Sequence, residues 1–238
     1  MRVLIYLTLL FSLTACSEKD LRKTIEIINA SVEEVPLTRE EVSAALKDSL
    51  SKGISKASIV AGANNGYLGN PELKIQFPED ARKVEDALRK IGLGSEVDRF
   101  VQQLNRGAEA AAVKAKPIFI KAITSLTIQD AFGILNGSQD AATQYLIRTT
   151  GDELYSQFLP VVGNTLDEVK ATRYYDDIVE RYNEIPGVRK VNPDLDDYAT
   201  EKAIDGLFLL VAKEEANIRA NPRARTTQLL KRVFGSLD

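Results

Sequence analysis

The segment that decides the fold runs from Leu195 to Ala220 and reads LDDYATEKAIDGLFLLVAKEEANIRA. Its apolar residues recur at spacings of three, four and seven, which predicts one long helix with a single apolar stripe. The stripe consists of Ile204, Leu207, Phe208, Val211 and Ile218. Because successive helical residues are about 100° apart, Glu215 falls inside this stripe and Glu214 on its margin. A carboxylate there needs a cation or several hydrogen-bond donors, since an ionised group is costly to remove from water.

Cations for these acids follow closely in the sequence, as Arg219, Arg223 and Arg225. Asn221-Pro222 predicts the start of a second helix, with Asn221 as its N-cap. That start would bring the two later arginines around a corner towards the acids. We interpret Glu214, Glu215 and the arginines as an ion-pair cluster that fastens the last two helices together.

The alternative interpretation of the same residues is a chemical or ligand-binding site. Paired carboxylates can carry out acid-base chemistry or hold a hard metal ion, while Arg219 or Arg223 holds an anionic substrate. We favour the structural interpretation, because ion-pair networks also place acids inside proteins and no second catalytic group is evident. We therefore assign no catalytic residue, no metal ligand and no cofactor.

The remainder of the chain predicts helices joined by loops. Thr38 and Glu41 have the spacing of a capping box, and Thr127 with Asp130 marks another helix start. Only residues 73–77 alternate apolar and polar side chains, so they predict at most one short strand or extended segment. The expected fold class is all-α, with a single compact multi-helix domain over residues 37–238.

Polar residues also interrupt the helix expected after Gly94. Asn105, Arg106 and Glu109, together with Asp130, form a secondary polar cluster, which solvated faces and helix caps largely explain. The same helix carries an alanine-rich face, whose small side chains permit close approach of a neighbouring helix. That face consists of Ala108, Ala111, Ala112 and Ala115. Pro117 then either kinks this helix or starts a new one.

Residues 1–15 have the features of a lipoprotein signal peptide. Met1-Arg2 gives a positive start, an apolar run follows, and Leu13-Thr14-Ala15-Cys16 resembles a bacterial lipobox. The resemblance implies cleavage before Cys16, lipidation of that cysteine with palmitate or similar acyl chains, and a tether over residues 16–36. Ser17 stands where an aspartate would retain the protein at the inner membrane. We expect a lipoprotein at the bacterial cell envelope, facing the periplasm and anchored in the outer membrane.

The composition excludes several functional classes. The 238-residue chain has a formal charge of −3, no histidine and one cysteine. Without histidine there is no Ser-His-Asp or Cys-His catalysis and no imidazole-bound zinc. A single cysteine excludes an internal disulfide and thiolate metal clusters. Because no clustered basic run is present, we expect no nucleic-acid partner.

The C-terminal string from Ala212 to Gly235, AKEEANIRANPRARTTQLLKRVFG, resembles the signature of a family of uncharacterised bacterial exported proteins and lipoproteins, known only as a domain of unknown function. Earlier matches stand in the family's order and include Leu104-Asn105-Arg106 with Glu109, Pro117-Ile118-Phe119 and residues 127–131. The resemblance covers residues 37–235. It implies an α-helical exported domain and supplies no activity, catalytic residue or cofactor.

These observations lead to one functional expectation and two alternatives. We expect a non-enzymatic helical module that is bound to the membrane through the lipid on Cys16 and binds an envelope protein or a small ligand. The first alternative is a carboxylate-dependent envelope enzyme, with or without a metal ion, centred on Glu214 and Glu215. The second is a carrier of a small apolar ligand, which predicts a deep cavity beside the alanine-rich face.

Overall fold

The computed structural model describes residues 37–90, 92–167, 194–221 and 227–235, together with residues 175, 179–180, 183–184, 186–187 and 190–191. The predicted signal peptide, Cys16, the tether, Arg223 and Arg225 lie outside the described residues. From Thr38 onward the described residues form one compact unit. Their regular secondary structure is helical, without a strand, which confirms the all-α class.

Seven α-helices and one 3₁₀ turn make up this unit within the described ranges. They are α2 (Arg39–Gly62), η1 (Glu79–Ala81), α3 (Arg82–Lys90), α4 (Gly94–Thr124), α5 (Ile128–Leu135), α6 (Ala141–Asp167), α8 (Leu195–Ala220) and α9 (Gln228–Gly235).

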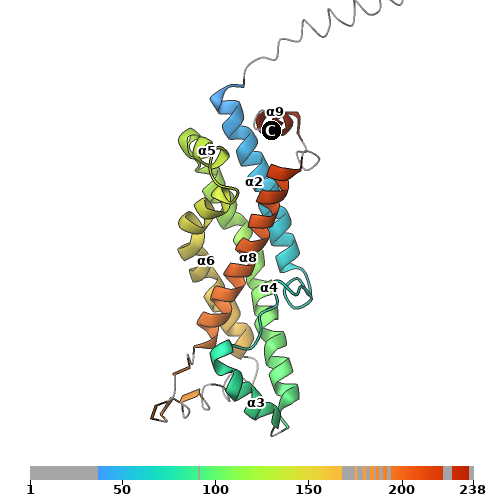
Figure 1. Ribbon diagram of the computed structural model, residues 1–238, viewed down its shortest axis with the longest axis vertical. Helices are drawn as coiled ribbons and strands as arrows, with labels where there is room; N and C mark the ends of the chain where they lie inside the picture. The colour runs from blue at the N-terminus through green and yellow to red at the C-terminus, as the bar shows by residue number, and fades with distance from the viewer. Residues whose placement is uncertain are drawn as a thin grey trace, which may run out of the picture. The chain divides into compact units, whose positions relative to one another are not determined.

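The four long helices, α2, α4, α6 and α8, run in alternating directions, as in an antiparallel bundle (Figure 1). α4 packs against α2, α6 and α8, and α8 also packs against α2 and α6. The shorter helices pack on this frame, α3 against α4, α5 against α2 and α6, and α9 against α2. The core therefore lies between helices whose apolar faces all point inward.

Two of the predicted helix starts are confirmed. The Thr38 hydroxyl accepts the Glu41 N–H at 3.1 Å, and the Glu41 carboxylate accepts the Thr38 N–H at 2.8 Å. Thr127 and Asp130 form the same reciprocal box at the start of α5. The predicted start at Asn221-Pro222 leads into residues 222–226, which lie outside the described residues, and the last described helix begins at Gln228. Thr127 has a counterpart there in Thr227, whose hydroxyl accepts the Leu230 N–H at 3.1 Å and supplies the cap.

Both long helices that contain a proline continue through it. α4 passes through Pro117 and α6 through Pro160, so neither proline starts a new helix. Proline removes one backbone hydrogen bond to the carbonyl four residues earlier. Those carbonyls belong to Val113 and Ser156, and all four of these residues are exposed. Water can satisfy the freed carbonyls, which explains why the helices tolerate the prolines.

The alanine-rich face of α4 lies at the centre of the bundle. Ala108, Ala111, Ala112 and Ala115 are all fully buried, as the prediction of close helix approach requires. The approach is close at Gly107, where an added Cβ would lie 3.4 Å from the Cα of Val162 on α6. Small side chains on α4 therefore bring α6 close to its backbone.

Residues 63–78 join α2 to the turn before α3 and pack across α4 and α8 without forming a strand. Leu73, Ile75 and Phe77 are buried, whereas Gln76 is exposed and Lys74 half-exposed. The predicted alternation is therefore present as an extended segment rather than a strand. A strand requires a second backbone to pair with, and a side chain takes that place here.

Tyr67 anchors this connection to α8. Its ring is fully buried, and its hydroxyl donates to the Ala203 carbonyl at 2.5 Å. Burial, followed by the nearby Glu109 carboxylate, raises the pKa of Tyr67, so the hydroxyl stays a donor at neutral pH. A Cβ at Gly206 would lie 2.8 Å from Cε1 of the Tyr67 ring. Only glycine at position 206 leaves room for the ring.

We predict that Gly206→Ala destabilises the fold by about 1–3 kcal/mol, because the ring is fixed by its hydroxyl and cannot move aside. Gly151→Ala is the matched control, since a Cβ there meets no atom within 4 Å. It should stabilise α6 by about 0.5–1 kcal/mol through helix propensity. Urea unfolding followed by circular dichroism measures both. Equal effects of the two substitutions would contradict the proposed packing.

Candidate functional site

Glu215 is the buried acid of α8, and only 5 % of its surface is exposed, as its position in the apolar stripe predicts. Its Oε1 accepts the Ala142 N–H at 3.0 Å. Its Oε2 accepts the N–H and the hydroxyl of Thr143 at 2.9 and 2.8 Å. Amides in the first turn of a helix have no partner inside that helix. Glu215 therefore caps the start of α6 from a different helix.

Arg219 lies one turn further along α8 and completes this arrangement. Its Nε and Nη2 donate to Glu215 Oε1 at 3.1 and 2.8 Å. Nη2 also donates to the Ile134 carbonyl at 2.8 Å and Nη1 to the Leu135 carbonyl at 3.4 Å, at the end of α5. The cation thus lies at a helix C-terminus and the anion at a helix N-terminus, which matches the signs of both helix dipoles.

Glu214 faces a different neighbour from Glu215. Its carboxylate pairs with Lys56 of α2, with Oε1 2.6 Å from Nζ. The lysine side chain is 60 % exposed and that of Glu214 is 20 % exposed, so this pair borders solvent. The two adjacent acids therefore stabilise separate helix contacts. A site in which both carboxylates act on one substrate or metal ion would require them to point to the same place.

Glu109 holds the connection between α2 and α3 against α4. The acid is 5 % exposed, and its Oε1 accepts the N–H groups of Tyr67 and Leu68 at 3.1 and 3.2 Å. Its Oε2 lies 2.6 Å from Nη1 of Arg106. The same guanidinium donates to Asn65 at 3.0 Å. This part of the secondary cluster is therefore a loop anchor.

Asn105 pairs with the extended segment as a neighbouring strand would. The residue is fully buried, and its Oδ1 accepts the Ile75 N–H at 2.9 Å. Its Nδ2 donates to the Ile75 carbonyl at 2.9 Å and to the Val101 carbonyl at 2.7 Å. Both backbone groups of Ile75 are satisfied by a single side-chain amide.

Asp130 has a different role from the other members of its predicted cluster. Its carboxylate accepts the N–H and the hydroxyl of Thr127 at 3.0 and 2.7 Å, at the start of α5. These hydrogen bonds, the one from the hydroxyl first, lower the pKa of Asp130. Asp130 is therefore a helix cap, and its hydrogen bonds go to Thr127 and not to Asn105 or Glu109.

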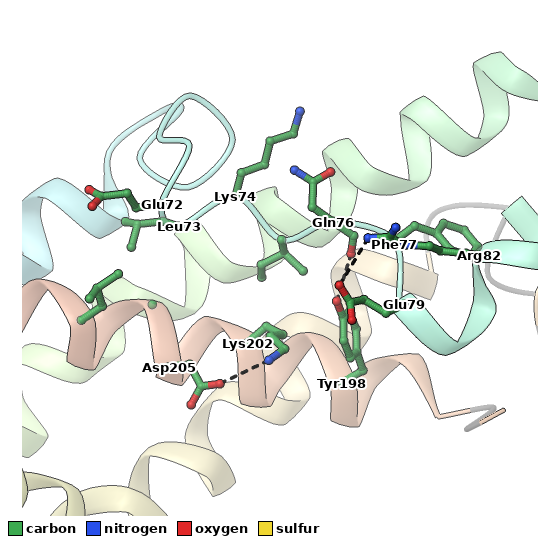
Figure 2. A pocket seen from close by; sticks show the side chains of 13 residues that line it. Glu72, Leu73, Lys74, Gln76, Phe77, Glu79, Arg82, Tyr198, Lys202 and Asp205 are labelled. Carbon is green, nitrogen blue, oxygen red and sulfur yellow. Dashed lines mark hydrogen bonds and ion pairs between the residues drawn. The ribbon is translucent and has the colours of Figure 1, made fainter.

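A groove of about 840 Å³ lies between the extended segment and α8 (Figure 2). Its volume falls in the range of small-molecule binding sites. The segment contributes residues 72–77, the turn before α3 contributes Glu79, and the start of α3 contributes Arg82. The residues from α8 are Tyr198, Lys202, Asp205, Gly206 and Leu209. Sequence reasoning missed this groove, because its two walls are more than a hundred positions apart in the sequence.

Most charges around the groove are paired. Arg82 lies 3.3 Å from Glu79, and Lys202 lies 3.5 Å from Asp205. Glu72 pairs with Lys213. Within the described part of the chain no acid pairs with Lys74, whose side chain points away from α8 (Figure 2). Lys74 is therefore the cation that the groove leaves available.

Two further features bear on possible functions. Among the described residues, no group of three or more acidic or cysteine side chains is placed to hold a metal ion. In the same residues, no single helix has the length and apolar composition to cross a membrane, and α4 and α5 meet that criterion only jointly, across a bend of 107°.

Comparison with known proteins gives one match. Residues 36–235 match a family described as "Protein of unknown function (DUF4197)". No curated protein and no solved structure matches the chain. The match covers most of the chain and includes every helix described above, so the helices and both polar clusters lie within the family's sequence range.

We predict that Glu215→Gln lowers the free energy of unfolding by about 3 kcal/mol, because it leaves Arg219 buried without its anion and turns an amide towards N–H donors. Glu214→Gln is the matched control and should cost less than about 1 kcal/mol, since its pair borders solvent. Urea denaturation of both variants tests the difference. Similar losses for the two acids would refute the assignment of Glu215 as the cap of α6.

A second prediction concerns Asn105. Asn105→Leu keeps the volume of the side chain but leaves the N–H and carbonyl of Ile75 unpaired, so we expect a loss of about 2–4 kcal/mol. Hydrogen exchange of the Ile75 amide should also become faster. Gln102→Leu, at an exposed position of the same helix, should change stability by less than about 0.5 kcal/mol. Unchanged exchange at Ile75 in Asn105→Leu would contradict the pairing.

Proposed function

Because the chain belongs to the DUF4197 family of proteins of unknown function, we propose its function from its own residues. It is a lipid-anchored helical protein that faces the periplasm and binds a protein or small ligand at the bacterial cell envelope, without catalysing a reaction. The observation that carries this proposal is the contrast between its buried acids, whose oxygens are fully engaged, and its open groove, which keeps unpaired polar groups.

The buried acids support a structural role rather than catalysis. Glu215 accepts five hydrogen bonds, from Ala142, Thr143 and Arg219. Glu109 accepts the amides of Tyr67 and Leu68 and pairs with Arg106. A general acid or base must exchange a proton with a substrate within hydrogen-bond reach. Neither acid can do so without giving up the contacts that hold helices or loops in place.

The groove supports a binding role. It is open to solvent, it combines apolar residues such as Leu209 with charged ones, and it leaves Lys74 available. Binding sites commonly combine an apolar surface with a few polar groups that fix the orientation of the ligand. These properties fit recognition of a partner at the envelope.

The membrane anchor rests on the sequence of the N-terminus. Cys16 ends a segment that resembles a lipobox, and Ser17 follows in place of the aspartate that favours retention at the inner membrane. Lipid on Cys16 would hold the helical domain at the outer membrane, with the tether over residues 16–36 between them.

The two alternatives have less support. An enzyme centred on Glu214 and Glu215 would need the two acids to act together, yet they bind Lys56 and Arg219 on different sides of α8. A carrier of an apolar ligand would use the alanine-rich face. Those alanines are fully buried against neighbouring helices, and none of them lines the groove.

The anchor can be tested by acyl labelling. We predict that Cys16→Ala abolishes incorporation of a palmitate analogue and releases the protein from the membrane fraction. Ser17→Asp is the control, because it should keep the label while moving the protein to the inner-membrane fraction in a host with aspartate-dependent sorting. Labelling that persists in Cys16→Ala would remove the lipoprotein assignment.

A further inference from the structure

The extended segment has one satisfied backbone edge and one open edge. In an extended chain, the backbone groups of successive residues point to opposite sides. Asn105 on α4 takes both groups of Ile75. The Lys74 carbonyl and the backbone groups of Gln76 therefore point to the other side, towards the groove beside α8, while the Lys74 N–H donates to the Asn70 carbonyl at 2.8 Å.

Two groups on the open edge lack partners within the described residues. The Gln76 N–H donates to no acceptor there, and the Lys74 carbonyl accepts no hydrogen bond. The Gln76 carbonyl is held by the hydroxyl of Tyr198 at 3.2 Å. The Lys74 carbonyl and the Gln76 N–H flank Ile75, and they are the two groups through which an added strand bridges to such a residue, in either direction. An added strand can therefore form one pair of backbone hydrogen bonds with this edge, opposite Ile75.

The groove next to this edge suits an extended chain. On α8, Lys202, Asp205 and Leu209 line the wall that faces this edge. Leu209 is 39 % exposed and offers an apolar contact on that wall. Lys74 and Gln76 border the groove on the opposite side (Figure 2). Side chains of an added strand would alternate between the α8 wall and solvent.

We propose that this groove binds an extended, acidic peptide segment of another envelope protein, which adds as a strand to the Lys74–Gln76 edge. Main-chain hydrogen bonds to the Lys74 carbonyl and the Gln76 N–H supply the pairing, and a carboxylate of the peptide pairs with Lys74. Such strand addition is a general mode of peptide recognition by exposed edges. This inference rests on the proposed binding function and names the class of partner.

The test uses peptides selected on the full-length protein in detergent. A phage-displayed library of random twelve-residue peptides is panned against it, and the dissociation constants of the selected peptides are measured by fluorescence polarisation. Gln76→Pro removes the N–H and keeps the carbonyl, and it should weaken binding by at least about fivefold. Gln76→Ala is the matched control, because it keeps the N–H and should bind within about twofold.

The charge is tested separately with Lys74→Glu. Selected peptides should contain acidic residues and should bind this variant at least about fivefold more weakly. Hydrogen exchange provides a measurement on the unsubstituted protein, since bound peptide should slow exchange of the Gln76 amide at least about tenfold. This measurement keeps the test decisive if Gln76→Pro disturbs the fold.

Peptides that bind Gln76→Pro and the unsubstituted protein equally, with no slowing at Gln76, would overturn strand addition while leaving the proposed binding function in place. A library that yields no binding peptide would also overturn strand addition. Peptides that lack acidic residues and bind Lys74→Glu normally would overturn the assignment of an acidic partner. Failure of the lipid anchor appears only in the Cys16→Ala experiment, so the two proposals can fail independently.

Discussion

The ion pair between Glu215 and Arg219 is the interaction on which the bundle depends most. An α8 acid and an α8 base, one turn apart, reach the start of α6 and the end of α5. Unpaired amides and carbonyls at helix ends would otherwise be buried without partners. The pair thus satisfies two helix ends and its own charges together, which explains how a carboxylate can lie in an apolar stripe.

A second group of buried side chains satisfies backbone groups in the same way. Asn105 and Glu109 lie on the buried face of α4 and take the backbone groups of the connection between α2 and α3. Since buried backbone groups need partners, these side chains hold in place a segment that has no strand beside it. Fixing one edge of that segment leaves the other edge turned to the groove, so a structural residue creates the surface on which the proposed recognition depends.

Local patterns predicted the elements well. The apolar spacing of residues 195–220, the capping boxes at Thr38 and Thr127, and the alternation at residues 73–77 are all present as expected. The helix start at Gln228 was not predicted, because Thr227 and Asn221-Pro222 are both good caps and local sequence does not rank them. The sequence also did not predict that α4 and α6 continue through their prolines, since this depends on which carbonyls face water.

The sequence by itself determined that the chain is helical and that Glu215 would be buried and in need of donors, because both follow from periodicity along one helix. Only the tertiary structure decided which donors meet that acid, that Glu214 turns to Lys56, and that Asn105 pairs with Ile75. Those choices depend on how separate helices pack. The groove is likewise a product of packing, since it exists only where residues 72–77 lie beside α8, and contacts between segments so distant in sequence leave no local pattern.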